Sequence, residues 1–239
     1  MHRLPENHDC PQMELARRPK VKEIPVTTQK QSSYKYTITL GPTVRMGKQI
    51  YFSPKEIRHL AIASLLVVGI GLSSGIFIQM DQPLMIALCA VILTASFFTH
   101  EIAHKITAQR RGLWAEFRLT LIGAVITLIS IISIFKIISP GAVMIAGSAR
   151  REDIGKISIA GPATNIILST MLLSVAFLPT EYALVLLLGA AINASIALFN
   201  LIPAGILDGF KIFAWNKKIW TSAFILSLAL TVLSYWIIF

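Results

Sequence analysis

Residues 100–104 read His-Glu-Ile-Ala-His, and they contain the side chains best suited to chemistry in this 239-residue chain. His100 and His104 are four residues apart, so on a helix both imidazoles lie on one face and can bind the same metal ion. Glu101 lies next to them, where its carboxylate can accept a proton from a water molecule that the metal activates. The spacing therefore predicts a zinc hydrolase, with two histidine ligands and a glutamate base.

The motif lies near the end of an apolar run, Leu84–Ala108, that is long enough to cross a lipid bilayer. The whole chain is 54% hydrophobic and only 14% charged, with a mean hydropathy of +0.67. These values exclude an ordinary soluble domain and indicate a multi-pass membrane protein. A charged side chain at the centre of a bilayer costs about 2.5–3.5 kcal/mol, so ionisable residues there mostly serve a function. We therefore expect this motif to work inside the membrane.

The formal net charge of +10 raises the question of a nucleic-acid partner. Eleven of the 22 Lys and Arg residues precede residue 59, and most of the others follow directly after apolar runs. That distribution is typical of the charge bias that orients membrane proteins, and a basic nucleic-acid groove would be arranged differently. We expect the lipid bilayer to surround the protein, and we expect no nucleic-acid partner.

Two domains are predicted from the change in composition near residue 50. Residues 1–50 are basic, proline-rich and without hydrophobic periodicity, which predicts a largely disordered cytoplasmic tail. Residues 51–239 are expected to form the membrane-embedded catalytic domain. Its first helix should begin at Ser53-Pro54-Lys55-Glu56, where a serine can cap the helix and proline suits the first position.

Six apolar runs of about 18–25 residues follow, each long enough for a helical span at 1.5 Å per residue. They are Leu60–Met80, Leu84–Ala108, Leu119–Ser139, Gly161–Leu178, Ala183–Pro203 and Ile219–Phe239.

Basic residues between the runs decide how many of them cross. Four Lys and Arg residues between positions 45 and 58 place the N-terminus in the cytoplasm. If Leu119–Ser139 crossed, Arg150, Arg151 and Lys156 would lie outside, whereas a segment that enters and returns keeps every basic cluster cytoplasmic. The eight isoleucines of this segment favour extended backbone, and Ala142–Ala146 is a further possible strand.

We therefore predict an all-α multi-pass protein of the cell membrane, with about five to six transmembrane helices. A short re-entrant β segment is expected between its second and third full spans. The alternative is that residues 119–139 form an ordinary sixth transmembrane helix.

A catalytic zinc takes three protein ligands and leaves one position open, so a third ligand is needed. The other acidic residues fall in the tail, in predicted outer connectors or in charged cytoplasmic stretches, which leaves Asp208. Pro203 and the two glycines that follow it predict that the backbone leaves the helix before Asp208. His104 lies one residue before a lysine and Asp208 three residues before one, so both should approach the membrane from the cytoplasmic side.

Three motifs in order resemble the site-2 protease family of intramembrane zinc metalloproteases. They are His-Glu-x-x-His at 100–104, Gly-Pro-x-x-Asn at 161–165 and Asn-x-x-Pro-x-x-x-x-Asp-Gly at 200–209. The segments at 112–118 and 140–143 are similar to archaeal-type members.

The resemblance implies one Zn²⁺ per chain, held by His100, His104 and Asp208, with Glu101 as the general base. It implies a metalloendopeptidase that cuts transmembrane helical protein substrates in or near the membrane, as in regulated intramembrane proteolysis. It also suggests that Asn165 and Asn200 hold the substrate backbone or the developing oxyanion. Hydrogen bonding between spans is the alternative role for both asparagines.

Three other functions remain to be weighed against this one. A zinc transporter would need further polar ligands on neighbouring spans and often a histidine-rich loop. A non-cleaving relative that only binds membrane helices is less consistent with the intact Glu101. A membrane metallopeptidase for soluble or lipidated substrates would usually take a glutamate ligand from a Glu-x-x-x-Asp helix, a pattern that we do not find.

Overall fold

The computed structural model describes residues 50–73, 82–133 and 136–239. The tail predicted for residues 1–50 lies outside these ranges except for its last residue. The elements in chain order are α2 (Pro54–Ser73), α4 (Pro83–Arg110), β1 (Trp114–Leu119), α5 (Leu121–Ile132), β2 (Gly141–Ala146), α6 (Arg151–Ala176), α7 (Ala183–Asn200), α8 (Asp208–Trp215) and α9 (Lys217–Ile238).

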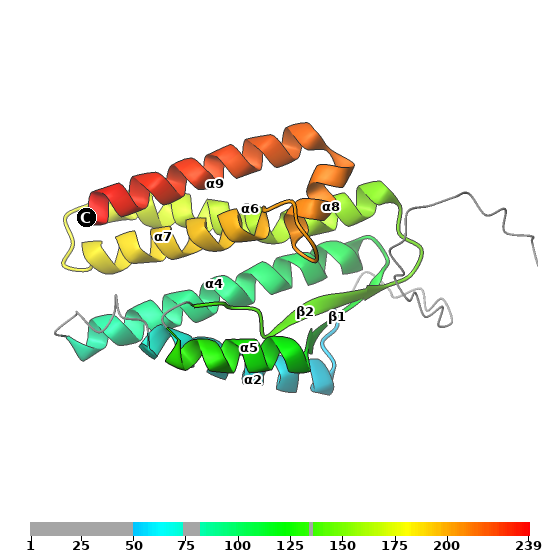
Figure 1. The fold of residues 1–239 in the computed structure, drawn as a ribbon, viewed down its shortest axis with the longest axis horizontal. Helices are drawn as coiled ribbons and strands as arrows, with labels where there is room; N and C mark the ends of the chain where they lie inside the picture. Colours follow the sequence, from blue (N-terminus) through cyan, green and yellow to red (C-terminus); the bar gives the residue numbers. More distant parts are fainter. Residues whose placement is uncertain (1–49, 74–81, 134–135) are drawn as a thin grey trace, which may run out of the picture. The chain divides into compact units, whose positions relative to one another are not determined.

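Five helices in the described part of the chain are long and apolar enough to cross a membrane, namely α2, α4, α6, α7 and α9. Figure 1 shows α4, α6, α7 and α9 running lengthwise through the fold. Helix α5 has 12 residues and is therefore about 18 Å long, which is too short for a hydrocarbon core of about 30 Å. Five helices of spanning length and one shorter apolar helix among the described residues match the number of crossings and of shorter segments expected from the charges. The side of the membrane that each end faces stays a prediction.

The first long helix begins where the sequence predicts. The side-chain oxygen of Ser53 accepts a hydrogen bond of 3.1 Å from the backbone nitrogen of Glu56, and Pro54 is the first helical residue. This cap provides a partner for one of the N–H groups that the first turn of a helix leaves unpaired.

The prediction of extended backbone across residues 119–139 is wrong for most of this segment. Leu119 ends β1, and the side chain of Thr120 then caps α5 by accepting from the backbone nitrogen of Gly123. A helix pairs its backbone groups within itself, which a lone extended segment in apolar surroundings cannot do. This requirement outweighs the β preference of the isoleucines.

The strand predicted at Ala142–Ala146 is confirmed as β2, which begins one residue earlier, at Gly141. It pairs antiparallel with β1, and Phe117 lies opposite Val143. Strand β1 was not predicted from the sequence. Figure 1 shows this sheet beside α4, with α5 and α2 next to each other.

A buried ion pair joins the start of α2 to α4 and β1. The Lys105 ammonium pairs with Glu56, and these two residues are 1% and 0% exposed. The other carboxylate oxygen of Glu56 accepts from the backbone nitrogen of Phe117 at 2.9 Å, and Lys105 also lies over the ring of Phe52. Glu56 was predicted from the sequence only as part of the start of the first helix, so its pairing with Lys105 was not foreseen.

Candidate metal centre

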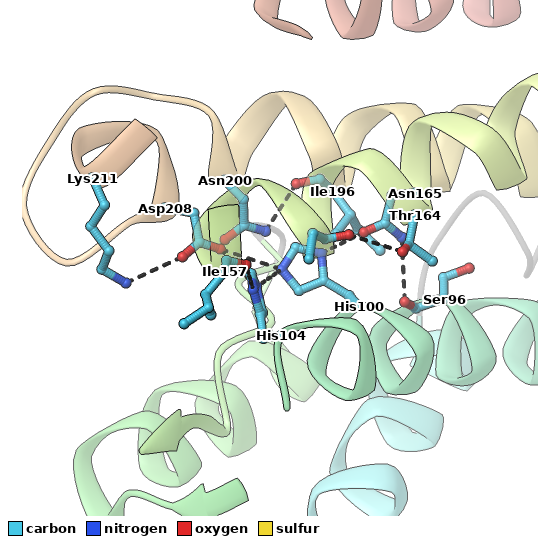
Figure 2. A network of polar contacts seen from close by, with 11 residues as sticks. Ser96, His100, His104, Ile157, Thr164, Asn165, Ile196, Asn200, Asp208 and Lys211 are labelled. Atoms are coloured by element: carbon cyan, nitrogen blue, oxygen red, sulfur yellow. Dashed lines mark hydrogen bonds and ion pairs between the residues drawn. The ribbon is translucent and has the colours of Figure 1, made fainter. Parts of the chain in front are cut away.

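Two elements bring the three candidate ligand side chains together, as Figure 2 shows. His100 and His104 lie one turn apart on α4, and Asp208 is the first residue of α8. Asp208 Oδ2 is 2.9 Å from His104 Nε2 and 3.6 Å from His100 Nε2, and the two Nε2 atoms are 3.1 Å apart. Within the described residues, this is the one group of three His, Cys, Asp or Glu side chains that could hold a metal ion.

The spacing of these atoms fits a tetrahedral zinc ion. Ligand atoms at zinc bond lengths of 2.0–2.1 Å lie about 3.4 Å from one another in a tetrahedron. The three separations in the structure, 2.9, 3.1 and 3.6 Å, fall around that value. Both imidazoles are buried, since His100 and His104 are 4% and 7% exposed.

The outward nitrogens of both imidazoles are held by α6. His104 Nδ1 donates to the carbonyl oxygen of Ile157 at 2.8 Å, and His100 Nδ1 donates to the side-chain oxygen of Asn165. Each ring therefore carries a proton on Nδ1 and turns Nε2 toward Asp208 and toward the other imidazole. Outer hydrogen bonds of this kind orient histidine ligands in metal proteins.

Gly161 lies between these two contacts on the same face of α6, because residues 157, 161 and 165 are spaced by four. A Cβ atom at position 161 would lie 2.4 Å from His104 Nε2 and 2.6 Å from His100 Nε2. Such an atom would fill the space next to both ligand nitrogens. The absence of a side chain at Gly161 thus leaves room for an ion there.

The chain between α7 and α8 is irregular, as the sequence predicts, and this places Asp208. Helix α7 ends at Asn200, and Gly205 adopts a φ of +57°, a conformation that favours glycine. The backbone then returns close to the end of α7, since a Cβ on Gly209 would lie 2.2 Å from the carbonyl oxygen of Leu201. This return aims the carboxylate of Asp208 at α4.

The surroundings of Asp208 favour its charged form. Burial opposes ionisation, but the nearby imidazoles of His104 and His100 outweigh it, together with Lys211 at 3.2 Å, and the pKa of Asp208 is held well below its usual value. A carboxylate in this state is ready to bind a cation.

Glu101 lines a cavity of about 710 Å³ that also reaches the three ligand residues. Residues of α4, α7, β2 and the chain before α8 form its mostly apolar walls. The backbone of Val143 in β2 hydrogen-bonds to Glu101. The proposed base and the proposed ligands therefore line one cavity.

The two asparagines named by the resemblance lie in different surroundings. Asn200 lines the cavity, and its amide nitrogen donates to the carbonyl oxygen of Ile196 at 2.9 Å. Asn165 is fully buried and is bound to His100 and to Asn193. These contacts support a role for Asn165 in orienting His100, a candidate metal ligand. Substrate binding by either asparagine stays a prediction.

Sequence reasoning missed Asn193. It is 1% exposed and lies on α7 inside the apolar run Ala183–Pro203, where a polar amide could have been noticed.

Relatives of this chain carry names that fit this geometry. A protein of Methanocaldococcus jannaschii named putative zinc metalloprotease is 32% identical over 175 residues, which cover 71% of this chain and 88% of the relative. The putative zinc metalloprotease Rip3 of Mycobacterium tuberculosis is 29% identical over 139 residues, 54% of this chain and 31% of the relative. No family model matches the chain. No solved structure matches it either. With its three motifs and its likeness to the archaeal relative, the chain belongs to the site-2 protease family of zinc metalloproteases.

Proposed function

We propose that this protein is an intramembrane zinc metalloprotease of the cell membrane, with a cytoplasmic N-terminus. It hydrolyses peptide bonds in or near the transmembrane segments of membrane-protein substrates. The observation that carries this proposal is the meeting of His100, His104, Asp208 and Glu101 at one cavity among helices of membrane-spanning length.

In this mechanism His100, His104 and Asp208 hold one Zn²⁺. When bound, zinc polarises the substrate carbonyl and lowers the pKa of a water molecule to about 7. Glu101 accepts the proton of the attacking water and later gives it to the leaving amine. The hydrogen bond from Val143 helps to fix the carboxylate of Glu101 for both steps.

A transmembrane substrate hides its carbonyl groups in internal hydrogen bonds, so it must unwind before it can be cut. Strand β2 offers a place for the unwound segment. Phe117 lies opposite Val143, but its backbone nitrogen donates to Glu56, so the N–H groups of this pair point away from the partner strand. On β2 that direction leads to Glu101 and the cavity. An extended substrate could therefore add to this edge as a further strand, with its scissile carbonyl beside the base.

Cleavage of a model single-span substrate by the purified protein in detergent tests the proposal. We expect cutting by the wild type, loss of cutting with a chelator and recovery when zinc is added back. Glu101→Gln should bind zinc and cut at least about 100-fold more slowly, because general-base catalysis contributes about that much or more. Cutting that continues at the wild-type rate in Glu101→Gln would rule out the proposed base.

Zinc transport is the rival function from another class. A transport path needs successive ligands at several depths, whereas the described residues contain one group of three ligands. If the protein binds zinc and moves it across liposome membranes but cuts no substrate, transport is the better description. Zinc binding with neither flux nor cleavage would favour the relative that only binds membrane helices.

A further inference from the structure

A chain of buried amides links the backbone of α7 to the metal ligand His100. Asn193 lies on α7 and Asn165 on α6, and these residues are 1% and 0% exposed. Asn193 Nδ2 donates to the carbonyl oxygen of Gly189 at 2.9 Å, and Asn165 Nδ2 donates to Asn193 Oδ1 at 2.9 Å. Asn165 Oδ1 then accepts from Nδ1 of His100.

The direction of this chain is fixed at its far end. The carbonyl of Gly189 can only accept, so the amide nitrogen of Asn193 must face it and the amide oxygen must face Asn165. Asn165 must in turn present its nitrogen to Asn193 and its oxygen to His100. An amide oxygen can only accept, so His100 carries its proton on Nδ1 and leaves Nε2 free to bind a metal.

A second contact of Asn165 is weaker. Its amide nitrogen also donates to the carbonyl oxygen of Ser96, but at 3.3 Å, and that carbonyl also accepts from the hydroxyl of Thr99. The shorter contact with Asn193 is therefore the main one that sets the orientation of Asn165.

We propose that Asn193 is a positioning residue for the metal site, acting through Asn165 to hold His100 in its metal-binding tautomer and orientation. This inference rests on the proposed function, since it concerns the same zinc ligand. It assigns a role to a residue that lies outside all three sequence motifs.

A matched control is available on the same pair of helices. The hydroxyl of Ser169, which is fully buried on α6, donates to the carbonyl oxygen of Ala190 on α7 at 2.8 Å. Ser169→Ala thus removes one buried hydrogen bond between α6 and α7 without interrupting the chain to His100.

The experiment measures Zn²⁺ affinity of the full-length protein in detergent by competition with a chelator, and the visible spectrum of the Co²⁺-loaded protein. Loss of an outer hydrogen bond to a ligand typically weakens metal binding about 10- to 100-fold, and Asn193 acts one residue further away. We therefore expect Asn193→Ala to weaken zinc binding about 3- to 10-fold and to alter the cobalt spectrum. Ser169→Ala should resemble the wild type in both measurements.

Two results would overturn the inference. They are wild-type affinity in Asn193→Ala, or an equal loss of affinity in Ser169→Ala. A wild-type protein that binds no zinc would instead refute the proposed function, so the two failures can be told apart.

Discussion

At the scale of single residues, position 161 decides how much room the two imidazoles leave for an ion. Zinc binds histidine nitrogen at about 2.0–2.1 Å. A Cβ on Gly161 would lie 2.4 and 2.6 Å from the two Nε2 atoms, so a methyl group and an ion would compete for one place. The first position of the Gly-Pro-x-x-Asn motif is thus glycine for a steric reason, because a side chain would meet the imidazoles. Its last position is asparagine because its amide oxygen accepts a hydrogen bond from His100.

We predict that Gly161→Ala weakens zinc binding at least about 100-fold while the protein stays folded. Alanine favours a helix interior over glycine by about 1 kcal/mol, so α6 itself should not be weakened. Zinc stoichiometry and thermal unfolding in detergent would measure the two effects separately. Gly69→Ala is the control, because its added methyl meets the flexible end of Ile131 between α2 and α5. Full zinc occupancy in Gly161→Ala would show that the ion does not lie beside this residue.

The sequence revealed part of this site for clear physical reasons. His100, Glu101 and His104 share a local spacing, and Asp208 follows from elimination among few acidic residues, so all four could be named without a structure. The structure brings them to one cavity, and their roles remain proposals. Asn193 could not be assigned in this way, because its importance depends on the direction of hydrogen bonds across three helices.

At the scale of elements, tertiary contacts and the apolar surroundings determined secondary structure that the local preferences of the residues did not predict. Residues 121–132 are rich in isoleucine, yet they form α5, whose end residues Leu121 and Ile132 are 81% and 89% exposed. Such exposed apolar side chains are expected where lipid surrounds the protein. Strand β1 carries a glutamate and an arginine in a charged stretch, so its pairing with β2 could not be predicted from alternation.

The ion pair between Glu56 and Lys105 should be a main fixed point between α2 and α4. Glu56→Gln keeps the shape of the side chain but leaves a buried ammonium without its counter-charge, which typically costs about 3–5 kcal/mol. We therefore expect a clear fall in the free energy of unfolding, measured by denaturant titration in detergent. The double variant Glu56→Gln with Lys105→Met should regain most of that loss, since the unpaired charge is gone. Equal stability of Glu56→Gln and wild type would show that the pair contributes little.

At the scale of the whole molecule, composition and charge indicated the architecture better than its details. The apolar runs predicted five or six spans because a helix in lipid must be both long and apolar, and five helices of the described residues meet that condition. The boundaries of the remaining segment depended on the pairing of β1 with β2, which brings together residues 22 to 32 positions apart. The same architecture places the site among helices, so a helical substrate has to unwind before one of its peptide bonds can reach the site.

A substrate helix must unwind at the cut before its carbonyl can reach Glu101, so the stability of that helix should limit the rate. Glycine weakens a helix by about 1 kcal/mol relative to alanine, and a barrier lowered by that amount corresponds to a rate about fivefold higher. We predict that single-span substrates with an alanine replaced by glycine next to the scissile bond are cut up to about five times faster. Initial rates of matched substrates would measure this, with the same replacement at the distant end of the span as the control. If the unmodified substrate and the substrates with glycine near the cut or far from it are all cut at the same rate, unwinding does not limit cleavage. The edge of β2 would then have to capture a segment that is already extended.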